Sequence, residues 1–249
     1  MAKAPAARRL SYPGNKYAAF HLLLCRWLRH HAQPTSYQYV TLGGTEFRDA
    51  VSLHFVDPEL LGQALSFEGH GGRFTIASET AARLREGGMQ IEVRRGNILT
   101  TFTRQSETPH LFFIDLLGIC AFGDYVERFG VMFQNETIRE RDCLLITSYL
   151  PARVGWPRVY TTFEGEFRLL GAGTVAEKKT CYTRHHPSFT LYRALRRVDL
   201  QDTLALTCFG GVAYRGKSSM GVFGYTVEPG STRLDTFANN SPWHTATYG

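Results

Sequence analysis

Paired cysteines are absent from this chain. It has five cysteines, an odd number spread over 249 residues, and none of them belongs to a C-x-x-C pair. Disulfide frameworks and structural zinc sites use cysteines at short, repeated spacings, so the sequence argues against both. The histidines also lack metal-ligand spacing, and no metal site is predicted. A reducing, cytoplasmic location is expected.

Long apolar runs are missing as well. The stretch LFFIDLLGICAF at 111–122 is too short and too polar to span a bilayer. The N-terminus, MAKAPAARRLSYPG, is basic, but no apolar core follows it directly as in a secretory signal. No membrane partner is therefore expected.

Two familiar catalytic fingerprints do not occur. Without G-x-S-x-G there is no nucleophile elbow of the α/β-hydrolase type. Without G-x-G-x-x-G an NAD-dependent oxidoreductase is the weaker of the cofactor-binding hypotheses.

The composition is that of a folded domain with a basic surface. Apolar residues make up 43% of the chain and charged residues 20%, which is enough to bury one sizeable core. The net charge of +6 permits a phosphate-rich partner. Positive charge gathers at 184–197, RHHPSFTLYRALRR, which includes Arg193, Arg196 and Arg197. This segment is either a nucleic-acid contact or an exposed basic face.

Helical and strand-like patterns alternate along the chain. Residues 16–32 have helical spacing and end before Pro34, which predicts an N-terminal helical segment at 1–36 and one domain at 37–249. The strand-like segments are 37–42, 64–68, 89–97, 110–118 and 141–151, and the helix-like ones are 46–55, 59–65, 75–88 and 122–133. Five alternations predict an α/β fold with a doubly wound, mostly parallel sheet. The β-rich runs 203–216 and 218–229 predict a C-terminal antiparallel hairpin.

Glycine or polar residues lie at four of the predicted strand ends. They are Gly43, Gly44, Thr45 and Glu46 after the first strand, Glu68 after the second, Gly96 and Asn97 after the third, and Asp115 in the fourth. Open α/β sheets bind ligands at the carboxyl ends of their strands. Glycines let a ligand approach the backbone, and an acid after the second strand is placed to hold a ribose diol. Burying a carboxylate such as Asp115 in an apolar run is costly unless it is paired or used.

The order of these features resembles the class I (Rossmann-like) S-adenosylmethionine-dependent methyltransferase fold over residues 37–229. The resemblance implies S-adenosylmethionine as cofactor. It assigns Gly43, Gly44, Thr45 and Glu46 to the methionine end, Glu68 to the ribose, Asn97 to the adenine, and Asp115 to catalysis at the acceptor. FFIDLLG is similar to the DPFG or DPPY stretch of members that modify DNA or RNA.

A second resemblance concerns the N-terminus. SYPGNKY at 11–17 looks like the YPGGK element of some adenine-N6 DNA methyltransferases, with Lys16 at its lysine. Together with Arg193, Arg196 and Arg197, Lys16 is therefore a candidate substrate-binding residue. A nucleic-acid or other phosphate-bearing acceptor is expected.

The chain departs from the family at the glycine loop. Thr41 stands where the family has an acid, and Phe47 stands where a third glycine is expected. DLLG also lacks the proline and aromatic residue of the fourth-strand motif. Two hypotheses remain open: a methyltransferase, and a catalytically inactive Rossmann-fold subunit that binds protein partners in a larger cytoplasmic, nucleic-acid-associated complex.

Overall fold

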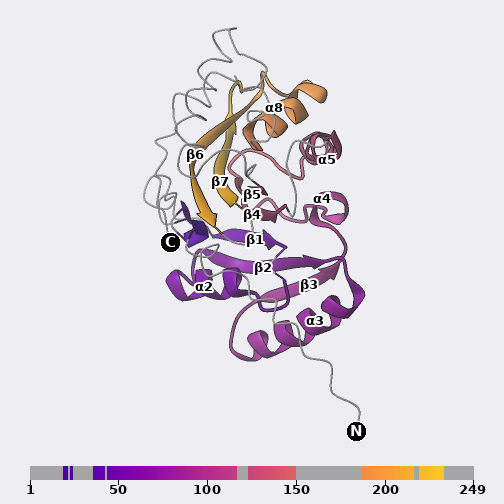
Figure 1. Cartoon of the computed structure of the whole chain (residues 1–249). Helices are drawn as coiled ribbons and strands as arrows, with labels where there is room; N and C mark the ends of the chain where they lie inside the picture. Colours follow the sequence, from indigo (N-terminus) through magenta and orange to yellow (C-terminus); the bar gives the residue numbers. More distant parts are fainter. Residues whose placement is uncertain are drawn as a thin grey trace.

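Seven strands form one mixed sheet in the order β3-β2-β1-β4-β5-β7-β6 (Figure 1). The computed structural model describes residues 19–21, 23–24, 36–42, 44–116, 123–149, 187–215 and 219–232. Along the chain the labelled elements are β1 (Tyr37–Thr41), α2 (Arg48–Val56), β2 (Leu61–Glu68), α3 (Gly71–Glu86), β3 (Ile91–Arg95), α4 (Ile98–Thr101), β4 (His110–Asp115), α5 (Gly123–Gln134), β5 (Cys143–Tyr149), α8 (Pro187–Arg197), β6 (Leu204–Arg215) and β7 (Ser219–Pro229).

Strands β1 to β5 are all parallel. β1 pairs with β2 on one side and with β4 on the other, while β3 and β5 extend the sheet outward. β7 lies between β5 and β6 and is antiparallel to both. The doubly wound, mostly parallel sheet and the C-terminal antiparallel hairpin predicted from the sequence are therefore confirmed.

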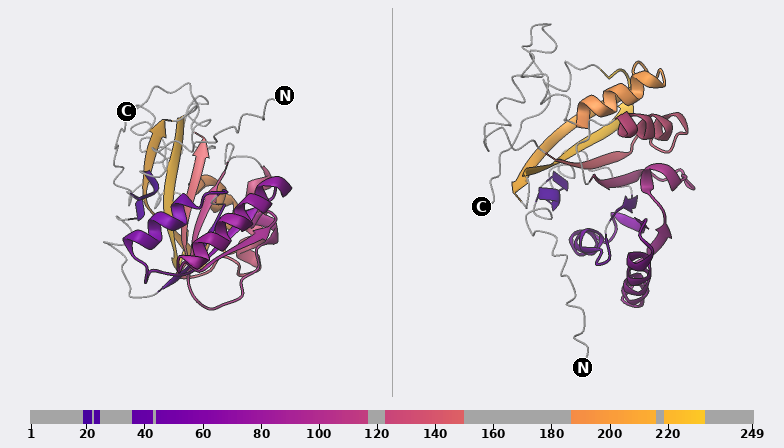
Figure 2. Two further views of the ribbon diagram at one scale, coloured as in Figure 1. Left: turned by 90° about the horizontal axis from the view of Figure 1, so that it is seen from below. Right: turned by 45° about the vertical axis from the view of Figure 1, so that its right-hand side comes forward.

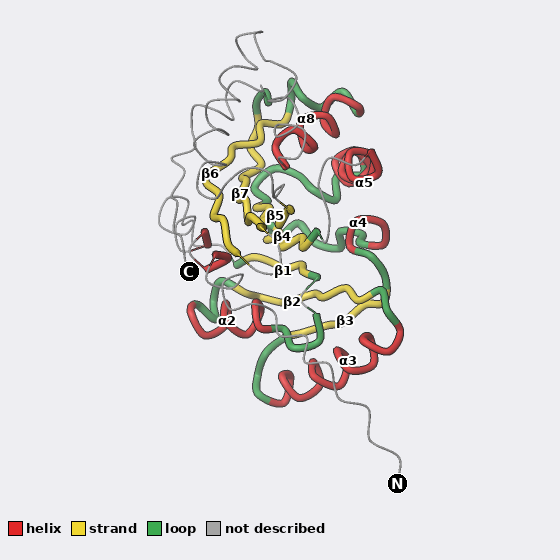
Figure 3. The backbone as a smooth tube through the Cα atoms, in the orientation of Figure 1, coloured by secondary structure: helices red, strands yellow, loops and turns green. Residues whose placement is uncertain are grey.

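Helices cover both faces of the sheet (Figures 2 and 3). One core cluster joins α2, α3 and the helical residues 19–21 and 23–24 to β1 and β4, with Phe20 against Phe113 at a ring separation of 4.7 Å. The other joins α4, α5 and α8 to the opposite face. β4 is buried along its whole length because it lies in the middle of the sheet, which explains its unbroken apolar run.

The helix predicted at 59–65 is wrong, because β2 begins at Leu61. Pairing with β1 and β3 overrides the helical pattern. Gly62, a poor helix former, lies at an irregularity in this pairing, where the register passes from Leu61 opposite Tyr37 to Gln63 opposite Gln38. The helix predicted at 75–88 is correct, but it begins earlier, at Gly71.

Candidate cofactor site at the carboxyl edge of the sheet

The junction from β1 to α2 is a strand, a turn and a helix, as the glycine pair indicated. Leu42 N–H donates to the carbonyl of Phe113 in β4 (3.4 Å), and Gly44 N–H donates to the carbonyl of Leu42 (2.7 Å). Gly44 has a φ of 64°, a conformation that glycine adopts without a steric penalty. Gly43 lies outside the described residues. Thr45 and the exposed Glu46 complete the turn, and Glu46 forms an ion pair with Arg48.

Phe47 occupies a position with glycine-like backbone geometry. It precedes α2 with φ 49° and ψ 33°, the left-handed conformation, which costs about 1–2 kcal/mol for a residue with a Cβ atom. Its side chain is fully buried in the same core cluster as Ala50 and Leu53 of α2. Burial of a phenylalanine offsets this strain. The backbone of the turn is thus compatible with a third glycine although the residue is not one.

Asp49 is a buried carboxylate that the sequence analysis missed. It lies in the first turn of α2 with 1% of its surface exposed. Its Oδ2 accepts hydrogen bonds from the hydroxyls of Tyr39 (2.6 Å) and Thr41 (2.7 Å) in β1. The available signal was an acid just after the turn, where a helix N-terminus favours negative charge. Asp49 thus places a carboxylate beside Thr41, where the family has its strand-end acid.

Glu68 and Asn97 lie at adjoining strand ends. Glu68 ends β2, and its Oε1 accepts a hydrogen bond from His70 N–H (2.9 Å). Gly96 N–H donates to the carbonyl of Glu68 (3.2 Å), which joins the segment after β3 to β2. Asn97 is the N-cap of α4, and its Oδ1 accepts from Leu99 N–H (2.9 Å). The structure therefore brings these two candidates together.

Asp115 ends β4 and is 9% exposed. It accepts a hydrogen bond from the hydroxyl of Thr147, its register partner in β5. This bond fixes the direction of the carboxylate. Residues 117–122, which complete the fourth-strand motif, lie outside the described residues.

Three of these groups share one edge of the sheet. β2, β1 and β4 are parallel neighbours (Figure 1). The Gly44 turn, Glu68 and Asp115 therefore all lie at the carboxyl ends of these strands. β2 and β3, the next two strands along the chain, lie on one side of β1, and β4 lies on the other. The boundary between β1 and β4 is therefore a topological switch point, where open α/β sheets bind ligands. The chain has the class I methyltransferase-type fold.

Comparison with known proteins concerns the fold alone. No protein-family model matches the sequence, and no curated protein does. The structure is similar to magnesium protoporphyrin IX methyltransferase from Synechocystis PCC 6803, with 10% identity, coverage of 86% of this chain and 84% of that chain, and a TM-score of 0.49. A SAM-dependent methyltransferase from Aquifex aeolicus has 11% identity, coverage of 86% and 93%, and a TM-score of 0.47.

A third solved structure is much longer than this chain. The pyocyanin biosynthetic protein PhzM has 9% identity and a TM-score of 0.46. The match covers 85% of this chain but only 55% of PhzM. This chain therefore spans about half the length of PhzM.

Three of the candidate substrate-binding residues lie on α8. Arg193, Arg196 and Arg197 are exposed. Arg196 lies 6.0 Å from the ring centroid of Tyr192, and Arg197 is 3.8 Å from Glu127. α8 ends shortly before β6, which runs parallel to β5 and therefore starts at the amino edge of the sheet. Arg196 and Arg197 are thus toward the edge opposite Asp115. Lys16 lies outside the described residues.

Residues 211–218, GVAYRGKS, match the P-loop spacing G-x-x-x-x-G-K-S. A P-loop needs a strand followed by a helix whose N-terminus faces the phosphates. Here β6 runs to Arg215 and β7 starts at Ser219, so the pattern spans a hairpin. The spacing therefore has no phosphate-binding context.

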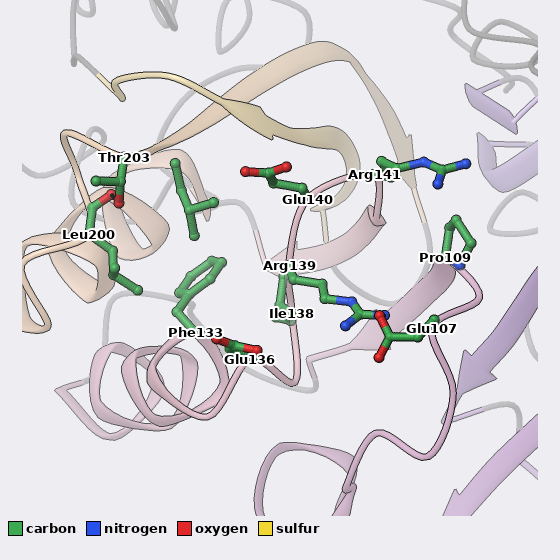
Figure 4. Close-up of a pocket in the computed structure, with 11 residues that line it drawn as sticks. Glu107, Pro109, Phe133, Glu136, Ile138, Arg139, Glu140, Arg141, Leu200 and Thr203 are labelled. Carbon is green, nitrogen blue, oxygen red and sulfur yellow. Dashed lines mark hydrogen bonds and ion pairs between the residues drawn. The ribbon is translucent and has the colours of Figure 1, made fainter.

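A cavity of about 410 Å³ lies at the amino edge (Figure 4). Phe133, Ile138 and Leu200 contribute apolar surface, and Glu107 and Arg139 form an ion pair at its rim. It is remote from the carboxyl ends of the strands and does not belong to the candidate site. Within the described part of the chain there is no group of three or more potential metal-ligating side chains and no helix able to cross a membrane.

Proposed function

We propose that the chain binds S-adenosylmethionine at the carboxyl edge of the sheet and transfers its methyl group. The observation that carries this proposal is the meeting of the Gly44 turn, Glu68 and Asp115 at neighbouring strand ends beside the β1–β4 switch point. The turn accommodates the methionine end, Glu68 binds the ribose hydroxyls, and Asn97 lies beside the adenine.

Each proposed role fits the bonds that the residue already makes. Glu68 uses Oε1 for one local hydrogen bond and is partly exposed, so the carboxylate retains acceptor capacity for a diol. Asp115 is held by Thr147 and faces the acceptor with a defined orientation. Methyl transfer needs the acceptor lone pair aligned with the sulfonium, so positioning provides most of the catalysis.

A nucleic acid or another phosphate-bearing polymer is the proposed acceptor. The net charge is +6, and α8 carries three exposed arginines. α8 has 11 residues, so it is about 16 Å long. An acceptor that reaches Asp115 and also contacts Arg196 and Arg197 at the far end of α8 has to be extended, as a polynucleotide backbone is.

The second candidate function is a catalytically inactive Rossmann-fold subunit of a larger cytoplasmic complex. Phe47 favours it, because a buried aromatic side chain replaces a glycine beside the proposed methionine end. Thr41 favours it too, because the strand end carries no acid of its own. In this case the fold serves protein contacts and leaves the carboxyl edge empty.

Isothermal titration with S-adenosylmethionine and S-adenosylhomocysteine separates the two functions. Micromolar binding supports the methyltransferase, and silence up to millimolar concentration supports the inactive subunit. Glu68→Ala is expected to weaken binding at least about tenfold, because a hydrogen bond to a charged group contributes roughly 1.5–3 kcal/mol. The matched control Glu79→Ala removes an exposed acid from α3 and should leave affinity unchanged. Unchanged affinity in Glu68→Ala would contradict the ribose assignment.

A further inference from the structure

The carboxylate of Asp49 is buried and has no cationic partner among the described residues. Oδ2 accepts two hydrogen bonds, both from neutral hydroxyls, and Oδ1 has no hydrogen-bond partner among the described residues. None of the ion pairs formed within the described ranges includes Asp49. A buried carboxylate is normally paired with a cation, because removal from water is costly.

The α2 N-terminus accounts for only part of this charge. Its dipole is equivalent to about half an elementary charge, and it acts within the first turn. The field of Asp49 also extends beyond its contacts. Burial lowers the pKa of His21, and the negative charge of Asp49 opposes that shift, although no hydrogen bond joins the two side chains. Asp49 therefore lies close enough to His21 for a negative charge on it to favour the protonated imidazole.

Asp49 lies next to the proposed cofactor site. Asp49 follows the Gly44 turn by five residues and is bonded to Thr41, the last residue of β1. Glu46 is also acidic, but it is exposed and paired with Arg48. Among the described residues, Asp49 is therefore the acid at the base of the turn that has no counter-ion, at the end of the site where the proposed cofactor carries its sulfonium and ammonium groups.

We propose that Asp49 is a specificity-determining residue, which makes the site prefer a cationic adenosyl ligand over a neutral one. The proposal rests on the proposed function, because it concerns the same site. Asp49 acts through its field and needs no contact with the ligand, since Oδ1 is buried. It supplies from α2 the negative charge that Thr41 does not provide.

The test compares S-adenosylmethionine with 5′-methylthioadenosine, which shares the adenosyl group but has neither the sulfonium nor the amino-acid moiety. Titration calorimetry is run on the full chain, on Asp49→Asn and on Asp57→Asn. Asparagine at 49 can still accept both hydroxyl hydrogen bonds but has no charge. Asp57, at the other end of α2, is the matched control for the loss of one acidic charge.

Asp49→Asn is expected to weaken S-adenosylmethionine binding at least about tenfold and to change 5′-methylthioadenosine binding less than twofold. Tenfold is about 1.4 kcal/mol, which a unit charge provides at ~12 Å in an effective dielectric constant of ~20. Asp57→Asn should leave both affinities unchanged. Equal weakening of both ligands would show that Asp49 only holds the turn, and no weakening of either would also overturn the proposal.

A replacement variant and the affinities of the unchanged chain distinguish a folding defect, a failure of the Asp49 proposal and a failure of the proposed function. If Asp49→Asn does not fold, as judged by circular dichroism, Asp49→Ser replaces it with the same expectation. If the unchanged chain binds both ligands with equal affinity, the inference on Asp49 fails while cofactor binding stands. If it binds neither, the proposed function itself fails, and the inference fails with it.

Discussion

Asp142 at the amino edge of the sheet is hydrogen-bonded far more fully than Asp49 and Glu68 at the carboxyl edge. At the amino edge, Asp142 accepts four hydrogen bonds, two from Arg104 (2.7 and 3.0 Å) and one each from the backbone N–H of His110 (2.8 Å) and Arg139 (2.9 Å). At the carboxyl edge, Asp49 has one oxygen without a partner among the described residues, and Glu68 makes one local bond.

This difference separates a structural site from a candidate binding site. Each carboxylate oxygen of Asp142 accepts two hydrogen bonds. Arg104 also donates to the carbonyls of Ser106, Thr108 and Thr137. A saturated network of this kind joins the loop after α4 to the starts of β4 and β5 and has no capacity left for a ligand. Unused acceptor capacity lies instead where the strands end.

Loss of Arg104 should have the largest effect on stability. Arg104→Met leaves Asp142 buried without its counter-ion, and the expected loss is about 3–5 kcal/mol in the free energy of unfolding. Urea denaturation measures it. Arg48→Met breaks the exposed pair with Glu46 and should cost less than about 1 kcal/mol. Similar losses in the two variants would remove the contrast between a buried clamp and a surface pair.

His110 makes the amino edge sensitive to acid. Its ring stacks on Phe112, and both ring nitrogens lack a hydrogen-bond partner among the described residues. Burial, with a further contribution from the charge of Arg104, lowers the pKa of His110 from 6.5 to about 4. The Thr108 carbonyl opposes this shift without meeting the geometry of a hydrogen bond.

Because the folded pKa of His110 lies below the unfolded value, the unfolded chain binds more protons between pH 6.5 and 4. The stability contributed by neutral His110 is present above pH 6.5 and is lost as the pH falls to about 4. The expected loss is about 2–3 kcal/mol. Carboxylates also titrate in this range, so the measurement is the difference between the unchanged chain and His110→Phe in urea denaturation at pH 7 and 4.5. If the free energy of unfolding changed equally with pH in the unchanged chain and in His110→Phe, His110 would not be the source of the acid sensitivity.

Gly96 tests the backbone of the carboxyl edge. It has a φ of 140°, and an added Cβ atom would lie 2.5 Å from Oγ1 of Thr101. Gly96→Ala should cost about 1–3 kcal/mol in the free energy of unfolding. At Gly72, in the first turn of α3, a Cβ atom meets its nearest neighbour at 3.7 Å, so Gly72→Ala should be neutral or slightly stabilising. Thermal unfolding of both variants is the measurement. Equal stability of the two variants would show that the backbone at Gly96, near Glu68, has no special need for glycine.

The α8 arginines should affect binding with little change in stability. If Arg193, Arg196 and Arg197 contact phosphates, affinity for an oligonucleotide falls steeply with salt. Replacing all three with Ala should reduce the slope of log K against log salt by roughly 0.7–0.9 for each lost contact. Fluorescence anisotropy from low to physiological salt measures this slope. An unchanged slope would assign these residues to an exposed basic face without a nucleic-acid role.

Local sequence patterns predicted most of the fold and part of the site. Alternating strand-like and helix-like segments, and two β-rich runs near the C-terminus, were sufficient for the parallel sheet and its hairpin. The same patterns failed at 59–65, where pairing with β1 and β3 imposes a strand. Asp49 was missed because its significance depends on Tyr39 and Thr41, ten and eight residues away on another element.

The sequence by itself determined which residues could form strands, helices and polar strand ends, because periodicity and turn chemistry are local. Only the tertiary structure decided which of those ends meet. Parallel pairing of β2, β1 and β4 gathers the Gly44 turn, Glu68 and Asp115, while the direction of α8 takes Arg196 and Arg197 toward the other edge. It also decided that Asp142 is saturated and Asp49 is not, because hydrogen bonds between distant elements depend on packing that no short stretch of sequence encodes.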